Sequence, residues 1–422
     1  MRVTVAIVST MDTKGREIAY LKDRIEKLGC TTLVIDVGVF APVGISPDVS
    51  REEVAGAAGS SISEILGQGH KGAAFHTMSK GAAHKISQLY AERGFDAIVS
   101  VGGGTGTHMV AGAMQALPMG VPKLMVTTVA SRDVSAIVGS KDITLMHAFC
   151  DIIGLNFMTK RLLGTAAGAI VGMVSVKRAP SPDSRVVGLT SFSPVNRCAR
   201  SAQEMLGAFG YEVVPFHAVG SGSMAMEALI NDRVIRGVLD LSLHEFADQI
   251  HNGYCKNIGP DRLENAGHMG LPHVILPGGL DMIVFECTSP EGVPEHLRNR
   301  KFVSHDFRSL LRTNADDYIR LAAIIAEKVN RAIRPPTLVI PLKGWSTIDD
   351  EGKPFYEPET NRVFVSEIKS RLLPRVKVVE VEAHINDDAC AKIVASELHD
   401  LMEHTYGSGS VSSTFGKSTD II

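Results

Sequence analysis

The chain has 422 residues, of which 45% are hydrophobic and 21% are charged. This composition is typical of a folded globular protein, and at about 150 residues per domain the length predicts two or three domains. Lysine and arginine number 43 and aspartate and glutamate 46, so a net charge of −3 does not favour a general nucleic-acid binder. The six cysteines lie far apart, with no CxxC pair and no Cys/His cluster at zinc spacing. We therefore expect a reducing compartment, no disulfide framework and no structural zinc.

The first residues enter a strand pattern directly, without the basic and apolar regions of a signal peptide. The most apolar stretch, residues 162–176, is shorter than the roughly 20 residues that a membrane span needs. We interpret it as a buried helix, and we expect a cytoplasmic protein that has no membrane partner.

Short runs rich in β-branched residues alternate with helical stretches along the chain, which is the pattern of βαβ units around a parallel sheet. The predicted strands are residues 3–8, 31–37, 72–76, 97–101, 123–129, 185–190, 211–216, 237–241, 273–276, 337–341 and 376–381. The predicted helices are residues 15–28, 109–117, 195–209, 314–333 and 387–403. The predicted fold class is α/β, with two Rossmann-like subdomains, each a mostly parallel sheet flanked by helices.

A polar, proline-bearing stretch at residues 178–184 separates two halves that restart with the same strand–helix–strand order. We predict an N-terminal Rossmann-like domain at residues 1–180 and a second one at residues 181–406. Residues 407–422 are rich in serine, glycine and threonine and are predicted to be a flexible tail.

A glycine-rich loop follows the strand predicted at residues 97–101 and leads into a helix. Glycines let backbone N–H groups approach a phosphate, and the helix presents its positive end to the same anion. The loop fits neither the Walker A nor the GxGxxG pattern, and a tight turn that needs glycine for its backbone is the alternative. We predict that phosphate is held by the residues of this loop, Gly102, Gly103, Gly104, Thr105, Gly106 and Thr107.

The loop after the first predicted strand contains Asp12, Thr13 and Lys14 at the start of a helix. These groups are suited to binding a phosphate and, through Asp12, to ordering a metal ion, although helix capping explains them equally well. Asp36 ends the second strand, where Rossmann-like domains often place an acid on a ribose hydroxyl. Further candidates for the same site are Thr128, Lys141 and Asp142.

A second glycine- and serine-rich loop, residues 220–227, precedes a helix of the second domain and resembles the first loop, although serine capping explains it almost as well. His147 is predicted to share a helical face with Asp151. If the protein is an enzyme, Asp142, His147 or Asp281 are candidates for proton transfer.

Many of these segments occur in the same order in an uncharacterised family that includes the N-terminal ATP-binding domain of the tomato mosaic virus resistance protein. The chain resembles that family nearly end to end, through residues 10–14, 102–107, 117–123, 127–131, 138–142, 220–229, 237–240, 280–282, 311–313, 352–356 and 384–387. One departure is the pair Ser223 and Met224, where relatives tend to have glycine and arginine. This departure shifts the predicted phosphate site to the first domain.

The resemblance implies two Rossmann-like subdomains, ATP binding and a homodimer, but it implies no reaction. The leading hypothesis is a cytoplasmic ATP-binding protein that uses Mg²⁺. The first alternative is a metabolic enzyme that acts on a small acid or phosphorylated compound in the cleft between the two domains. The second is a regulatory module whose bound ATP tunes its affinity for a partner. Whether ATP is hydrolysed is left open.

Overall fold

The computed structural model describes residues 3–67, 69–176 and 185–407. Contacts divide the chain into two compact units, residues 1–179 and 180–422, and each unit is described by itself below. The predicted domain boundary at residue 180 and the predicted tail beyond Gly407 lie outside the described residues. The domain limits therefore stay a prediction.

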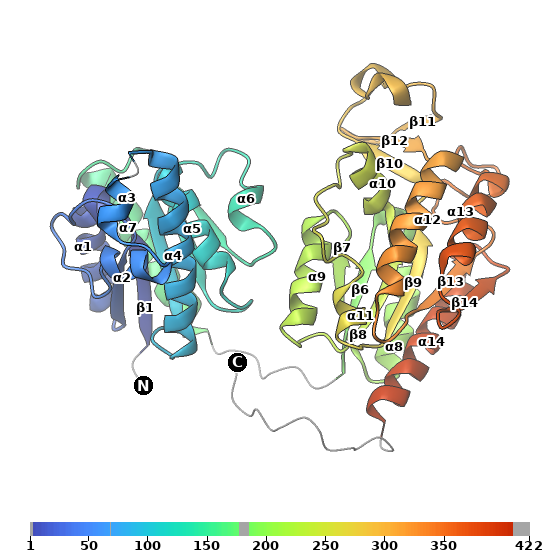
Figure 1. Cartoon of the computed structure of the whole chain (residues 1–422), viewed down its shortest axis with the longest axis horizontal. Helices are drawn as coiled ribbons and strands as arrows, with labels where there is room; N and C mark the ends of the chain where they lie inside the picture. The colour runs from blue at the N-terminus through green and yellow to red at the C-terminus, as the bar shows by residue number, and fades with distance from the viewer. Residues whose placement is uncertain (1–2, 68, 177–184, 408–422) are drawn as a thin grey trace. The chain divides into compact units, whose positions relative to one another are not determined.

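The first unit is a five-stranded parallel sheet with helices on both faces (Figure 1), and its strands run in the order β2-β1-β3-β4-β5. The strands are β1 (Thr4–Ser9), β2 (Thr31–Asp36), β3 (Ala97–Gly102), β4 (Lys123–Thr127) and β5 (Thr144–His147). The helices are α1 (Met11–Lys27), α2 (Arg51–Ala57), α3 (Ile62–Gly67), α4 (Lys71–Ala91), α5 (Gly104–Gln115), α6 (Ser135–Val138) and α7 (Phe157–Ser175).

Both faces of this sheet are buried, which explains why its strands are apolar without interruption. In β1, Val5 and Ile7 point toward the face covered by α1 and α7, whereas Ala6 and Val8 point toward the face covered by α2, α4 and α5. The apolar stretch considered as a membrane candidate forms most of α7, whose inner face packs on the sheet. Within the described residues no helix is both long enough and apolar enough to cross a membrane.

The second unit contains a six-stranded parallel sheet in the order β14-β13-β9-β8-β6-β7 and a separate three-stranded antiparallel sheet in the order β10-β12-β11. The strands are β6 (Val186–Ser191), β7 (Glu212–His217), β8 (Gly237–Ser242), β9 (His273–Gly278), β10 (Met282–Phe285), β11 (Phe302–Ser304), β12 (Ser309–Arg312), β13 (Thr337–Pro341) and β14 (Lys377–Val381). The helices are α8 (Asn196–Ala208), α9 (Ser221–Asn231), α10 (His244–His251), α11 (Asn265–His268), α12 (Ala315–Asn330), α13 (Pro358–Arg371) and α14 (Asp388–Tyr406), with short 3₁₀ turns at Ser193–Val195, Pro290–Gly292 and Glu295–Leu297.

The predicted fold class is confirmed, because both units are α/β with mostly parallel sheets flanked by helices. One predicted strand is wrong: residues 72–76 lie inside α4. Met78, Ala82 and Ile86 recur at helical spacing and are fully buried. Residues 72–76 form the first turns of this same helix.

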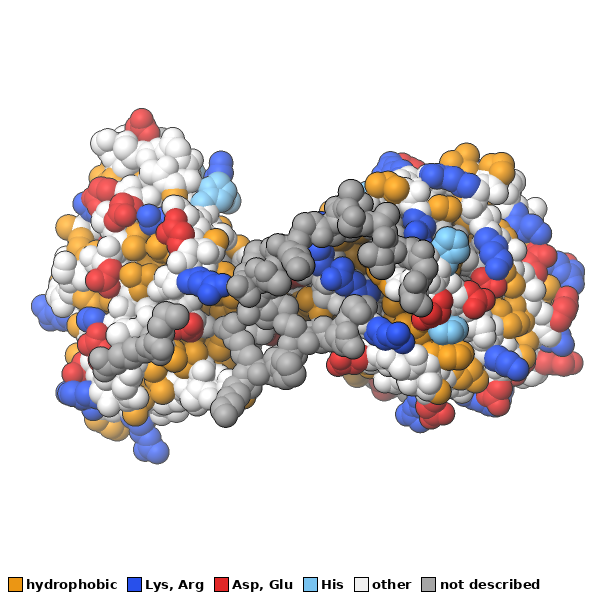
Figure 2. Space-filling view, turned by 90° about the horizontal axis from the view of Figure 1, so that it is seen from below, with side chains coloured by type: hydrophobic (Ala, Val, Ile, Leu, Met, Phe, Trp, Pro, Cys, Tyr) orange, Lys and Arg blue, Asp and Glu red, His pale blue; other side chains and the backbone are white. Residues whose placement is uncertain are grey.

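One face of the molecule agrees with the balanced charge of the sequence. On the face shown in Figure 2, acidic and basic side chains are interspersed over both units. That face therefore presents no extended field of a single sign that would attract a polyanion.

Candidate functional site

Two predicted loops meet at the carboxyl edge of the first sheet. Strands β1 and β3 are parallel neighbours, so the segments that follow them lie side by side. Together they line a pocket of about 680 Å³. From the first loop come Thr10, Asp12, Thr13 and Lys14; from the second come Gly103, Gly104, Thr105 and Gly106. Most of the predicted residues of these two loops therefore share one pocket.

Three glycines of the loop that follows β3, namely Gly103, Gly104 and Gly106, face open space. A β-carbon added at Gly103 or Gly106 would have no atom closer than 3.9 Å outside its own chain neighbours, and one at Gly104 would lie 3.8 Å from Val129 Cγ1. None of the three has a left-handed φ. Folding alone therefore does not require glycine at these positions, and the absence of side chains keeps the pocket open beside the backbone.

The same loop is also the beginning of α5. Gly103 is the N-cap residue of α5, and it offers no side chain to accept the first N–H groups of the helix. The amides of the first helical turn have no partner within a helix, and the helix dipole makes this end positive. The pocket floor is therefore suited to an anion.

The first loop opens α1 beside it. Thr10 is the N-cap residue, and its hydroxyl lies 2.8 Å from the Thr13 hydroxyl. Asp12 Oδ2 accepts hydrogen bonds from the N–H groups of Val39 (3.2 Å) and Phe40 (3.1 Å), so it positions the segment after β2 at the pocket rim. The Lys14 ammonium donates to the carbonyl of Ile152.

The remaining predicted site residues do not line this pocket. Asp36 is fully buried, and its Oδ1 accepts from Met11 N (3.0 Å) and Gly38 N (2.8 Å). Burial raises the pKa of Asp36, which holds the start of α1 and the segment after β2 from within. Thr107 is also buried, and its hydroxyl lies 2.6 Å from that of Thr127.

Four further predicted residues lie outside the pocket lining as well. Asp142 accepts from Lys123 Nζ (2.6 Å) and Gly120 N (2.7 Å), which fixes the turn before β4. The Thr128 amide bonds weakly to the Gly102 carbonyl (3.4 Å), and Lys141 follows α6 at a partly exposed position. Gly102 itself is required by the fold, because a β-carbon there would lie 2.8 Å from Thr107 N.

An apolar wall of the pocket was not predicted. It is formed by side chains from the segment after β2, from α3 and α4 and from α5, namely Val39, Phe40, Ile65, Leu66, Ala74, Phe75 and Met109. Phe40 is 64% exposed, which is unusual for a large apolar side chain. The pocket thus has a polar floor and an apolar wall.

The glycine- and serine-rich loop at residues 220–227, where α9 begins, differs from the loop at residues 102–107. A β-carbon at Gly222 would lie 2.0 Å from the His217 carbonyl oxygen, and one at Gly220 would lie 2.6 Å from that of Lys256. Ser223 is buried and donates to Glu245 Oε2 at 2.6 Å. Here the fold itself requires the glycines, and the serine serves the interior.

That glutamate belongs to a buried ionic network of the second unit. Arg262 is fully buried and donates to both carboxylate oxygens of Asp240 (2.7 and 2.5 Å) and to Glu245 Oε2 (3.1 Å). Beside it, Glu227 Oε1 accepts from Leu263 N (2.8 Å), while Glu227 Oε2 has no hydrogen-bond partner among the described residues. Burial raises the pKa of Glu227 to about 7.

This raised pKa makes a prediction for Glu227→Gln. Below the ordinary pKa of glutamate, the Glu227 carboxyl is protonated in the folded and in the unfolded protein, so its burial carries no charge penalty. As the pH rises, the carboxyl ionises first in the unfolded protein, which lowers the free energy of unfolding until the folded protein also ionises, at about pH 7. The wild-type unfolding free energy should therefore fall between about pH 4.5 and pH 7, relative to the variant, by on the order of 3 kcal/mol. Urea denaturation of both proteins across this range measures the difference, and parallel pH profiles would contradict the assignment.

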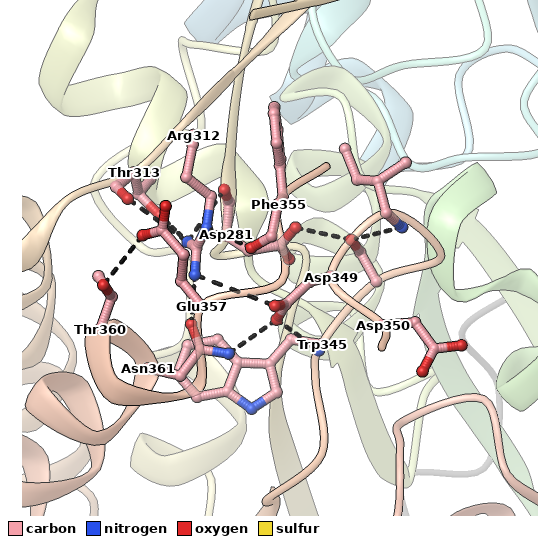
Figure 3. Close-up of polar contacts among 12 residues, drawn as sticks. Asp281, Arg312, Thr313, Trp345, Asp349, Asp350, Phe355, Glu357, Thr360 and Asn361 are labelled. Carbon is pink, nitrogen blue, oxygen red and sulfur yellow. Dashed lines mark hydrogen bonds and ion pairs between the residues drawn. The ribbon is translucent and has the colours of Figure 1, made fainter. Parts of the chain in front are cut away.

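A second buried cluster surrounds Asp281, which was a candidate for proton transfer. Asp281, Arg312 and Asp349 point toward one another from the ends of three different segments (Figure 3). Arg312 donates to Phe355 O (2.8 Å), and Asp281 Oδ2 accepts from Ser346 Oγ (2.6 Å). Burial, and then the charge of Asp349, raises the pKa of Asp281. The cluster is enclosed in the interior and ties the segments after β9, β12 and β13 together.

The other two proton-transfer candidates are placed differently. His147 ends β5, so the predicted helical pairing of His147 with Asp151 is wrong. Asp142 is occupied with Lys123, as described above. Asp142 and His147 belong to the first unit and Asp281 to the second.

Comparison with known proteins identifies the chain's relatives. Residues 3–179 match the N-terminal domain, and residues 184–402 the C-terminal domain, of an uncharacterised protein family, UPF0261. A UPF0261 protein of Clostridium tetani is 40% identical over 407 residues, which is 96% of this chain and 100% of that protein. The ToMV resistance protein Tm-1(GCR237) of Solanum lycopersicum is 33% identical over 326 residues, which is 75% of this chain and 43% of that protein.

Likeness to solved structures is much weaker. A UDP-N-acetylglucosamine 2-epimerase crystal structure is 12% identical with a TM-score of 0.25, covering 65% of this chain and 79% of that one. At this level of similarity it carries no argument about the chemistry of the pocket.

Proposed function

The chain belongs to the uncharacterised UPF0261 family, so we propose a function from the pocket itself: the first unit binds ATP with Mg²⁺. The observation that carries the proposal is the set of three glycines, Gly103, Gly104 and Gly106, that the fold does not require. They leave room for a ligand directly against the backbone at the start of a helix. Phosphate is the ligand group that such a site fits best.

Several features of the pocket support a nucleotide rather than a lone phosphate. Two helices, α1 and α5, begin at its floor, and their positive ends favour a polyanion. Its volume of about 680 Å³ falls within the ordinary range for small-molecule sites. The apolar wall, with Phe40 and Phe75, offers the kind of surface on which a purine stacks.

The donor set of the first loop fits Mg²⁺. Asp12 provides a carboxylate, and Thr10 and Thr13 provide hydroxyls, all of them hard oxygen donors of the type that this ion prefers. Bound there, Mg²⁺ would neutralise phosphate charge. Lys14 would add a positive charge beside it. The resemblance to the family adds a homodimer to the proposal, and the scattered cysteines, which indicate a reducing compartment, add a cytoplasmic location.

ATP with Mg²⁺ should raise the melting temperature of the full chain. A ligand that binds only the native state stabilises it by about 2.7 kcal/mol at a concentration 100 times its Kd. Differential scanning calorimetry with and without ATP·Mg²⁺ measures this shift, and ATP with chelator shows the contribution of the ion. An unchanged thermogram at the highest soluble nucleotide concentration would contradict the proposal.

A further inference from the structure

Three side chains with different metal-ligating atoms converge in the interior of the second unit. One ligand atom each from His244, Asp248 and Cys255 lies within 4.8 Å of the other two, and all three residues are 0% exposed. His244 and Asp248 are four residues apart on α10, so they share one helical face. Cys255 comes from the loop that follows α10 and turns back toward it.

The surroundings hold these groups in place. Asp248 Oδ1 accepts from Val284 N and Oδ2 from Cys255 N, each at 2.7 Å, so the carboxylate is fixed from two sides. The Nδ1 of His244 lies 3.1 Å from Ser242 Oγ, and its ring stacks on Phe192 at 3.8 Å between centroids. Ligands of protein metal sites are oriented by outer hydrogen bonds of this kind.

One atom of the cluster lacks a partner. His244 Nε2 is buried and makes no hydrogen bond within the described residues. A buried polar nitrogen without a partner costs on the order of 1–3 kcal/mol.

We propose that His244, Asp248 and Cys255 bind a Zn²⁺ ion in the second unit. A mixed set of imidazole, thiolate and carboxylate suits this ion, whereas Mg²⁺ and Ca²⁺ favour oxygen alone. The ion would provide the positive charge that a buried thiolate and carboxylate need, and it would pin the loop that contains Cys255 to α10. On binding, the thiol of Cys255 loses its proton to solvent.

The spacing of these three residues in the sequence did not predict a metal site. The cysteine has no second cysteine nearby, and the three ligands stand at positions i, i+4 and i+11, which is not a zinc-finger pattern. The alternative is a metal-free hydrogen bond from the thiol to Asp248. The two interpretations predict different metal contents.

The test uses the full chain, refolded from denaturant with reductant in the presence of Zn²⁺, of Co²⁺ or of chelator. We expect about one tightly held zinc ion per chain by mass spectrometry of the desalted protein. With Co²⁺, the thiolate should give a charge-transfer band in the near ultraviolet. Cys255→Ser, which retains a hydrogen-bond donor of similar size, should lose that band, and Cys150→Ser in the first unit should retain it.

A second readout does not depend on any variant. Trp345, the single tryptophan, is buried in the second unit, so its fluorescence follows the unfolding of that unit. We expect the zinc-refolded protein to unfold at a higher temperature than the chelator-refolded protein. Folded wild type without bound zinc, or a cobalt band that persists in Cys255→Ser, would each overturn the proposal.

Discussion

Arg262→Met is expected to lower the unfolding free energy of the second unit by roughly 3–5 kcal/mol. The guanidinium is fully buried and is the direct partner of Asp240 and Glu245, with Glu227 close by. Methionine fills much of the volume of the stem but removes the guanidinium that these carboxylates share. Breaking a buried ion pair from one side is costly because the remaining charge is desolvated and unpaired.

Urea denaturation followed by the fluorescence of Trp345 measures this loss in the unit where it occurs. Arg331→Met is the matched control, because Arg331 is 53% exposed and pairs with Glu327 and Glu264 at the surface. Surface ion pairs contribute about 0–1 kcal/mol, so the control should unfold close to wild type. Equal midpoints for the two variants would show that the buried network is not what stabilises this unit.

The sequence could not have predicted the role of Arg262. Its partners Glu245 and Asp240 lie 17 and 22 residues away, on different elements, and no periodic pattern links them. A charged residue in a polar loop is normally solvated, so the sequence favours an exposed position. Only the packing of the loop after α10 against β8 encloses the arginine.

The parallel strands were predictable for a physical reason. A strand buried on both faces reads as an unbroken apolar, β-branched run, and the runs that became β1, β3, β6 and β13 all have this character. The strand predicted at residues 72–76 was wrong because this segment lacks the β-branched character of a buried strand. A short apolar run there contains alanine and phenylalanine but no β-branched residue, and the helix around it was set by buried contacts further along α4.

The polar half of the pocket was also accessible from the sequence. Parallel strands place the loops that follow them at one edge, so residues 10–14 and 102–107 were expected to be neighbours. The apolar half of the pocket could not be predicted from the sequence, because Phe40, Leu66 and Phe75 come from three segments without a common motif. The sequence also did not show which glycines the fold requires. Backbone atoms approach Gly102 and Gly222 too closely for a side chain, whereas Gly104 has room for one.

That difference leads to the sharpest functional prediction, which concerns Gly104→Ala. The added β-carbon meets only Val129 Cγ1 at 3.8 Å, and alanine favours the helix more than glycine does. Stability should therefore be unchanged or rise by up to about 1 kcal/mol. A phosphate held against the backbone would nevertheless lose its close approach. The loss of one hydrogen bond to a charged group is worth about 1.5–3 kcal/mol, so ATP affinity should fall about tenfold or more.

Gly112→Ala is the matched control for this experiment. Gly112 lies in the same helix, α5, at an exposed position where an added β-carbon meets no atom within 4 Å, and it does not line the pocket. The substitution should stabilise the helix by up to about 1 kcal/mol without touching a ligand. Calorimetric titration of ATP·Mg²⁺ into both folded variants separates the two effects. If Gly104→Ala binds as tightly as Gly112→Ala, the start of α5 does not hold the phosphates, because only the first substitution changes the surface that they would contact.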